Sequence, residues 1–236
     1  MKAAVYVGTR NVYKDILPSL KSLLINSDVD RVYLLIEDDE FPYELPDCVE
    51  TINVSGQPYF SHDGPNYYGM KWTWMTMMRA ALAKVFPDLD VILSLDNDTI
   101  IDQDISELWD LPIDDYYYAA SREPLKSKGG RTYVCDLFTQ MGVVLYNLKK
   151  LRDGKADEVI DELNRHRYIF AEQDAFNMLC QGYIYPMPSM YNVCDYTEPA
   201  TYKKIYHFAA IWEWQNFPEV LKYKDIPWEK IPTRGV

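Results

Sequence analysis

Two aspartates separated by a single residue follow an apolar run of the chain. Residues 91–98 read Val-Ile-Leu-Ser-Leu-Asp-Asn-Asp, so Asp96 and Asp98 come directly after a stretch typical of a buried strand. If the chain stays extended, both carboxylates project the same way, because strand side chains alternate with a period of two. Two such carboxylates can bind a hard divalent cation whose open positions accept phosphate oxygens, as sugar nucleotides require. The alternative is a polar turn, which Asp and Asn also favour.

The composition limits the partners and the compartment. The 236 residues suit a single domain over residues 1–236 with one large core. A net charge of −12 argues against nucleic-acid partners and against strong membrane association, since both need a positive surface. The apolar runs are far shorter than the ~20 residues of a membrane helix. Four cysteines without a Cys-x-x-Cys pair, and no secretory segment before the first expected strand, predict a soluble, reduced, cytoplasmic chain.

Expected strands and helices alternate along the first half of the chain. Strands are predicted at 2–7, 31–36, 49–54 and in the run before Asp96, and helices at 15–26 and 70–86. This order predicts an α/β fold, Rossmann-like, with a mostly parallel central sheet flanked by helices. Ligands of such sheets lie beyond the carboxyl ends of the strands, where Gly8-Thr9-Arg10 and Asp96-Asn97-Asp98 both fall.

The second half of the sequence is less regular. Strands are expected at 116–121 and 142–147, and helices at 156–165 and 173–181. Residues 184–236 are rich in proline, and we expect them to wrap over the sheet rather than form a second domain.

Four blocks, in one order, resemble glycosyltransferase family 8. They are Arg79 through Pro87 to Asp96-Asn97-Asp98, then Gly142-Val-Val-Leu-Tyr-Asn147, then Glu172-Gln173-Asp174-Ala-Phe-Asn177, and finally His207-Phe208. The resemblance spans roughly residues 3–214. It implies an A-type glycosyltransferase fold and transfer of a hexose from a nucleotide diphosphate sugar, with retention of anomeric configuration, to a hydroxyl of an acceptor such as a glycan. A UDP-sugar is the leading donor under this resemblance.

The resemblance also implies a role for each matching residue. Asp96 and Asp98 would bind Mn²⁺ or Mg²⁺, with His207 from the wrapping segment as the third protein ligand, and an imidazole nitrogen suits manganese better. Arg79 would meet the donor sugar or the metal-site carboxylates. The expected residues at the anomeric carbon or the sugar hydroxyls are Glu172, Gln173 and Asp174.

A further set of residues is expected to contact the nucleotide or the donor sugar: Thr9, Arg10, Asn11, Asn97, Gln140 and Gly142. Several positions depart from the family's pattern. Thr9 and Arg10 stand near the usual acidic reader of the uracil base, and Gln140 stands in place of an asparagine. After His207, the expected glycine and diphosphate-binding lysine are missing, and Glu213 cannot replace that lysine because it repels phosphate. Either the metal binds the diphosphate alone or another cation contributes, the candidates being Arg10, Lys126, Lys128 and Arg131.

Each matching residue also has an ordinary structural interpretation. Arg79 could face solvent on a helix, His207 could be a core histidine bonded to backbone, and Glu172 with Gln173 could simply begin a helix. Two other functions stay open. A sugar nucleotidyltransferase would need a longer glycine-rich loop than the one after the first strand, whereas a nucleotide-sugar binding protein without turnover is compatible with Glu213 and Gln140. The acceptor walls are expected to include Tyr59, Tyr67, Tyr68 and residues 126–133.

Overall fold

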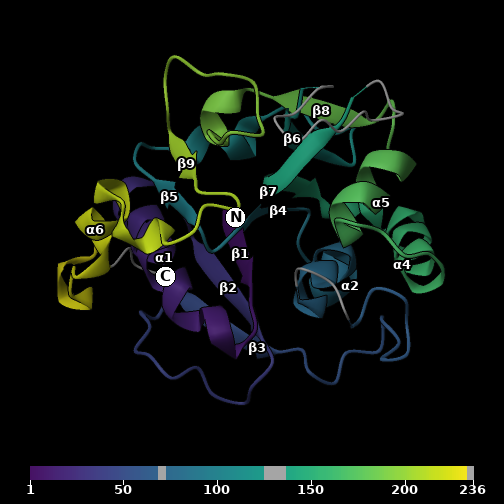
Figure 1. Cartoon of the computed structure of the whole chain (residues 1–236), viewed down its shortest axis with the longest axis horizontal. Helices are drawn as coiled ribbons and strands as arrows, with labels where there is room; N and C mark the ends of the chain where they lie inside the picture. The colour runs from purple at the N-terminus through teal and green to yellow at the C-terminus, as the bar shows by residue number, and fades with distance from the viewer. Residues whose placement is uncertain (69–72, 125–136, 233–236) are drawn as a thin grey trace.

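A seven-stranded sheet runs through the centre of the molecule (Figure 1). The computed structural model describes residues 1–68, 73–124 and 137–232. The strand order is β3-β2-β1-β4-β7-β6-β8. The strands are β1 (Ala3–Val7), β2 (Arg31–Ile36), β3 (Val49–Asn53), β4 (Val91–Leu95), β6 (Tyr118–Arg122), β7 (Thr139–Asn147) and β8 (Ile184–Met187). A separate two-stranded sheet pairs β5 (Thr99–Ile101) with β9 (Ile205–His207).

Most strand pairs of the large sheet are parallel, which confirms the predicted fold class. β1 pairs in parallel with β2 and β4, β2 with β3, and β6 with β8. Among the described residues of this sheet, only β7 pairs antiparallel with both of its neighbours, β4 and β6. Every residue of β7 is buried, in keeping with its central place between β4 and β6.

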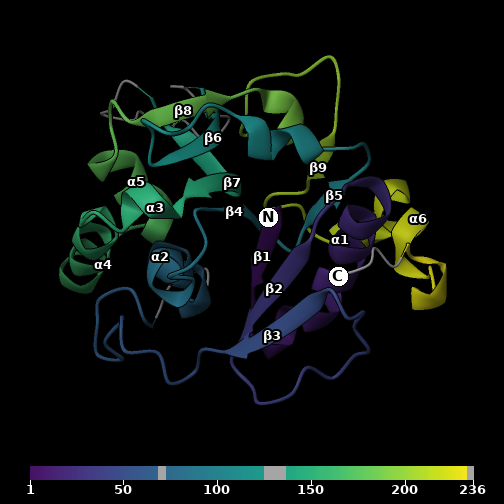
Figure 2. The ribbon, with the colours of Figure 1, turned by 180° about the vertical axis from the view of Figure 1, so that it is seen from behind.

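Each face of the sheet carries its own core, because successive side chains of a regular strand point to opposite faces. Ala3, Val5 and Val7 of β1 point into one core, and Ala4 and Tyr6 point into the other. The first core is covered by α2 (Leu82–Val85), α3 (Leu148–Leu151), α4 (Lys155–Arg165) and α5 (Ala171–Leu179). The second is covered chiefly by α1 (Tyr13–Asn26), and the two groups of helices lie on opposite sides of the sheet in both views (Figures 1 and 2).

The helix predicted over residues 70–86 is wrong in its type and extent. A 3₁₀ helix covers Trp74–Ala81 and only one α-turn, α2, follows, while residues 70–72 lie outside the described part. A 3₁₀ helix has three residues per turn, so side chains at i and i+3 lie in line. One such line, Met75, Met78 and Ala81, is fully buried in the first core. The other predicted elements begin and end within three residues of the observed ones.

Residues 184–232 only partly wrap over the sheet as predicted. Their first strand, β8, extends the edge of the sheet beside β6, so this stretch belongs to the sheet itself. Further along, β9 pairs with β5, and α6 (Pro218–Lys224) packs on α1. The Asn26 side chain of α1 donates to the Tyr223 hydroxyl of α6 over 2.8 Å. This return of the chain brings β9, and with it His207, back to the residues that follow β4.

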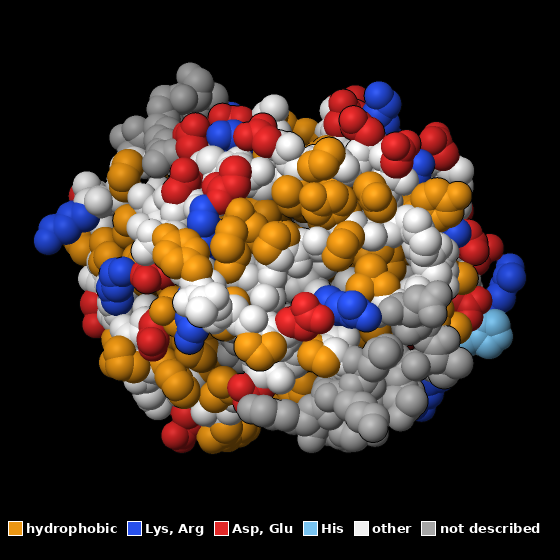
Figure 3. Space-filling view, turned by 90° about the horizontal axis from the view of Figure 1, so that it is seen from above, with side chains coloured by type: hydrophobic (Ala, Val, Ile, Leu, Met, Phe, Trp, Pro, Cys, Tyr) orange, Lys and Arg blue, Asp and Glu red, His pale blue; other side chains and the backbone are white. Residues whose placement is uncertain are grey.

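The surface agrees with the acidic composition. On the face seen from above, acidic and basic side chains are interspersed with hydrophobic ones and form no continuous basic area among the residues drawn there (Figure 3). The helices within the described ranges are all too short or too polar to span a membrane. The described cysteines, Cys48, Cys180 and Cys194, are free thiols.

Candidate active site

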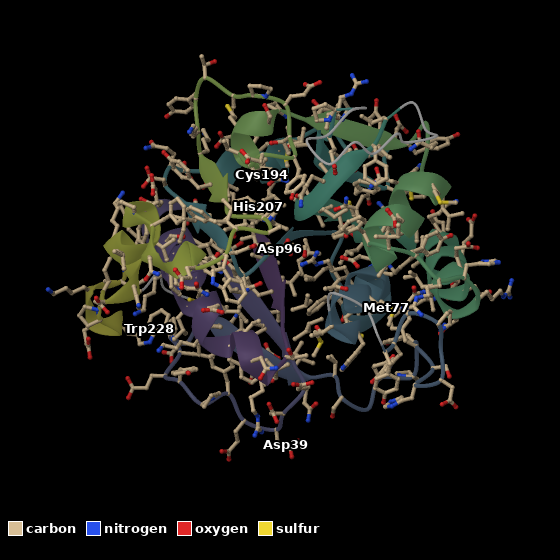
Figure 4. The ribbon with its side chains drawn as sticks, in the orientation of Figure 1. Asp39, Met77, Asp96, Cys194, His207 and Trp228 are labelled. Carbon is tan, nitrogen blue, oxygen red and sulfur yellow. The ribbon has the colours of Figure 1, made fainter. Side chains whose placement is uncertain are left out.

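Three residues from two distant parts of the chain meet at the carboxyl end of β4. Asp96 and Asp98 follow β4, and His207 ends β9, whose register sets His207 opposite Thr99. The His207 Nε2 atom lies 3.2 Å from Asp98 Oδ1 and 3.4 Å from Asp96 Oδ2. The view with side chains shows Asp96 and His207 close together at this edge of the sheet (Figure 4). The predicted metal-binding group is thus assembled in space.

The His207 ring is enclosed on all sides and only 3% exposed. Its Nδ1 atom lies 2.8 Å from the Asn192 side-chain oxygen, so Nε2 is the nitrogen that faces the carboxylates. Burial disfavours the imidazolium, but the carboxylates of Asp98 and Asp96 outweigh it and raise the pKa of His207 well above its usual value. The ring also lies against Gly142, where an added Cβ atom would come within 2.1 Å of His207 Cε1.

The donor set suits a divalent cation. One ligand atom from each of Asp96, Asp98 and His207 can be chosen so that all lie within 4.8 Å of one another. Two carboxylate oxygens and one imidazole nitrogen match Mn²⁺, and less well Mg²⁺, which prefers oxygen. A cation there would take the place of the proton that the carboxylates now favour on Nε2. The residues therefore fit the metal that the sequence predicts.

The buried Arg79 side chain is paired with two carboxylates, those of Asp96 and Glu172. Its Nη1 atom donates to Glu172 Oε1 over 3.1 Å and to the Met141 carbonyl over 3.3 Å, and Nη2 is ion-paired with Asp96. The side chain is 6% exposed, so the solvent-facing alternative is wrong. Because i and i+3 align in the 3₁₀ helix, Thr76 and Arg79 both reach Glu172.

The pKa values of the two carboxylates that Arg79 contacts shift in opposite directions. Burial alone would raise the pKa of Asp96, but Arg79 and His207 outweigh it and lower the pKa to about 2. For Glu172 burial is the stronger effect, and its pKa is raised in spite of Arg79. Of these two carboxylates, Asp96 is the one that Arg79 and His207 hold in its charged form.

The other residues predicted near the sugar lie at the start of α5. Gln173 accepts from the Met141 backbone N–H over 3.3 Å and donates to Glu123 over 3.4 Å. Asp174 accepts from the Phe170 N–H over 2.9 Å, at the beginning of the helix. Glu172 and Gln173 thus contact β7 and the metal-site region, whereas the Asp174 carboxylate turns to its own helix.

The residues predicted to bind the nucleotide are at the end of β1 and between the two aspartates. The Thr9 hydroxyl is buried and has no hydrogen-bond partner among the described residues. Arg10 is paired with Asp38 through Nε over 3.1 Å, and its side chain is 74% exposed. Asn11 is exposed, and Asn97 is half-buried. The other candidate cations, Lys126, Lys128 and Arg131, lie outside the described residues.

Two residues near the site carry no signal in the sequence. Asn192 is buried and contacts both His207 and Gln140, but it sits in an irregular stretch where asparagine is common. Glu123 is a buried carboxylate beside Gln173. Their partners are distant in sequence, so only the fold brings them to the site.

The segment after His207 contains a glycine-like backbone conformation although the expected glycine is missing. Ala210 and Glu213 both have φ 58°, a left-handed conformation that glycine adopts most easily. Of the expected acceptor walls, Tyr67 is buried and stacks on Trp74 with ring centroids 5.3 Å apart, whereas Tyr68 is exposed. Tyr59 is half-buried, and residues 126–133 lie outside the described part.

Residues 47–211, more than half of the chain, match the model of Glycosyl transferase family 8. The chain belongs to this family. A Haemophilus influenzae protein described in general terms as a glycosyltransferase is 25% identical over 116 residues, which are 45% of this chain and 35% of that protein. The chain thus spans about a third of the curated relative that it matches.

Solved structures share the fold. GlyE of Streptococcus pneumoniae superposes with a TM-score of 0.69 at 20% identity, covering 98% of this chain and 62% of GlyE. The galactosyltransferase LgtC, solved with donor and acceptor sugar analogues, gives a TM-score of 0.67 at 17% identity, covering 96% of this chain and 98% of LgtC. Mouse xyloside xylosyltransferase 1 gives 0.63 at 15% identity, covering 89% and 97%. The predicted A-type glycosyltransferase fold is thereby confirmed.

Proposed function

We propose that this family 8 protein is a metal-dependent, retaining hexosyltransferase. It takes a hexose from a nucleoside diphosphate sugar, with UDP as the leading nucleotide, and transfers it to a hydroxyl of an acceptor such as a glycan. The observation that carries the proposal is the convergence of Asp96, Asp98 and His207 at the carboxyl end of β4. In open α/β sheets this edge is where ligands bind.

Asp96, Asp98 and His207 would hold a divalent ion, which would supply positive charge to bind the donor diphosphate and to stabilise the leaving nucleoside diphosphate. The ion pair with Arg79 keeps the Asp96 carboxylate charged and oriented for metal binding. The same guanidinium holds Glu172 3.1 Å away, next to the residues proposed to meet the sugar. Protein side chains thus position the donor on a rigid support of β7, α5 and the 3₁₀ helix.

Retention is proposed to proceed without a covalent sugar adduct. Gln173 presents a neutral amide, which is a poor nucleophile, and its oxygen already accepts from Met141. Glu172 is engaged by Arg79, which weakens its capacity to attack the anomeric carbon. The acceptor hydroxyl would then lose its proton to the departing phosphate oxygen as the bond to the sugar breaks.

Substitutions at these two residues test the route. Gln173→Ala is expected to lower turnover by about 10- to 1000-fold, through lost positioning and charge stabilisation, and Glu172→Gln to keep part of the activity. A glycosyl adduct on Glu172, trapped with a slow donor analogue and detected by mass spectrometry, would establish the covalent route instead.

The nucleotide is proposed to lie at the end of β1. The buried, unpartnered Thr9 hydroxyl suits a hydrogen bond to a ligand there, and Asn11 is exposed beside it. Competition among uridine, guanosine and cytidine diphosphates gives the base. Tighter binding of guanosine diphosphate would replace the uridine assignment and leave the transferase proposal standing.

Release of nucleoside diphosphate, measured with Mn²⁺ and a panel of donor sugars, separates the proposal from its alternatives. A transferase releases the diphosphate, a nucleotidyltransferase exchanges pyrophosphate, and a binding protein does neither. Asp98→Ala should abolish Mn²⁺ binding in calorimetry without unfolding the chain, whereas Asp88→Ala, which removes an exposed carboxylate elsewhere, should not. Equal Mn²⁺ affinity in wild type and Asp98→Ala contradicts the metal site.

A further inference from the structure

We propose that Gln140 and Asn192 act as positioning residues that hold the His207 ring in one orientation, with Nδ1 protonated and Nε2 directed at Asp96 and Asp98. This inference deepens the metal role given to His207 above and rests on it. The contacts form a chain from the backbone of β7 through two buried amide side chains to the imidazole.

The donor and the acceptor of each of these three hydrogen bonds follow from the first bond, between Gly142 and Gln140. The Gly142 backbone N–H lies 2.6 Å from Gln140 Oε1, and a backbone nitrogen can only donate. The same Gln140 oxygen lies 2.7 Å from an Asn192 side-chain atom, which must therefore be the donating Nδ2. The Asn192 oxygen is then left to face His207 Nδ1 at 2.8 Å.

An amide oxygen has no proton to give, so the proton of this last bond belongs to Nδ1. His207 then offers the Nε2 lone pair to a cation, and Nε2 is the atom that lies 3.2 Å from Asp98 Oδ1. Metal-binding histidines usually donate their second N–H to an oxygen acceptor, which fixes the tautomer and makes the ligand more basic. Here Asn192 supplies that acceptor, and Gln140 of β7 holds the Asn192 amide in place.

Gln140 and Gly142 lie two residues apart on β7 and act on His207 in different ways. Gln140 provides the oxygen that orients Asn192, and Gly142 leaves the space in which the His207 ring lies, since an added Cβ would overlap it. The glutamine that departs from the expected asparagine is therefore tied into the support of His207, whatever it contributes to the donor sugar.

Calorimetric titration with Mn²⁺ tests this series of hydrogen bonds. Gln140→Met and Asn192→Ala each remove one link, and both are expected to weaken Mn²⁺ binding by about 10- to 100-fold. Gln140→Glu should bind at least as tightly as wild type, because a carboxylate oxygen accepts the same two hydrogen bonds. The matched control is Asn66→Ala, which removes a buried asparagine bonded to Leu163 and His166 and should leave Mn²⁺ affinity unchanged.

Nuclear magnetic resonance of ¹⁵N-histidine-labelled, metal-free protein gives a second readout that needs no metal. The chain contains three histidines, so His207 can be assigned by substitution. We expect a slowly exchanging proton on Nδ1 of His207 in wild type and Gln140→Glu, and its rapid exchange in Gln140→Met and Asn192→Ala. If wild type fails to bind Mn²⁺, the metal site is wrong, and this spectrum still decides the orientation of His207.

Two outcomes overturn the inference. One is a His207 Nδ1 proton that exchanges as rapidly in wild type as in Asn192→Ala. The other is wild-type Mn²⁺ affinity in both Gln140→Met and Asn192→Ala. If Gln140 merely contacts the sugar, Gln140→Met should raise the KM for the donor and leave Mn²⁺ affinity unchanged. Circular dichroism identifies a variant that does not fold, and the remaining variant then carries the test.

Discussion

Replacing Gly142 with alanine should damage the metal site more than the fold. An added Cβ would lie 2.1 Å from His207 Cε1, 2.6 Å from Nδ1 and 2.8 Å from Nε2. The ring would have to retreat by about 1.3 Å to reach an ordinary contact of 3.4 Å. It cannot do so freely, because Asn192 holds Nδ1 on one side and the carboxylates face Nε2.

The expected cost follows from that displacement. Overpacking of a buried position costs about 1–3 kcal/mol, which for a chain of this length lowers the Tm by about 2–12 °C. Loss of ligand geometry should weaken Mn²⁺ binding by at least the ~10- to 100-fold seen when a supporting contact is removed. The protein therefore still folds at 25 °C while its metal affinity falls sharply.

Thermal melting of the metal-free protein and calorimetric titration with Mn²⁺ measure the two effects separately. Gly56→Ala is the matched control, because its added Cβ meets nothing within 4 Å and its backbone has no left-handed φ. Wild-type Mn²⁺ affinity in Gly142→Ala would refute the reasoning, since His207 could then leave its observed position without loss.

Three further outcomes are expected. Arg79→Ala leaves Asp96 and Glu172 buried without their cation and should lower the free energy of unfolding by about 3–5 kcal/mol, measured by urea denaturation; a change below 1 kcal/mol would contradict the buried bridge. Ala210→Gly relieves a left-handed backbone and should raise stability by about 1–2 kcal/mol in the same assay, with no gain if the strain is absent. Burial raises the pKa of Cys180 to about 12, so this thiol contributes stability below pH 9 that is lost as pH rises towards 12. Iodoacetamide at pH 8 should therefore modify Cys180 only after unfolding, which mass spectrometry detects.

Local patterns in the sequence were sufficient for most of the elements. The strands that later form the centre of the sheet are continuous apolar runs, and the charged helix of residues 155–165 has a clear apolar stripe. The 3₁₀ helix before α2 escaped prediction because periods of 3.0 and 3.6 residues are hard to distinguish over eight residues. The antiparallel direction of β7 depends on pairing with distant strands, which no local pattern encodes.

In the candidate site, too, local sequence patterns identify some residues, whereas contacts between distant residues depend on the fold. Asp96 and Asp98 were visible because a strand run and two carboxylates are neighbours in sequence. The bridge from Arg79 to Glu172 joins residues 93 positions apart, and the contact of Gln140 with Asn192 joins residues 52 apart. Such contacts are set by the packing of α5 and the segment after β8 against β7, so the sequence could propose roles for Arg79 and Gln140 without showing what they touch.

We expect diphosphate binding at the proposed metal site to depend on the cation, because the site is acidic. Asp96 and Glu172 are paired with Arg79, and Asp98 lies beside His207, so a divalent ion would be needed to offset these three carboxylates and would leave little positive charge for a diphosphate. The lysine expected after His207 from the family resemblance is missing, Glu213 cannot replace it, and Arg10 is already paired with Asp38. Calorimetry should therefore show uridine diphosphate binding with Mn²⁺ and none without it. Glu213→Lys should create metal-independent binding of uridine diphosphate, and no change in that variant would place residue 213 away from the diphosphate.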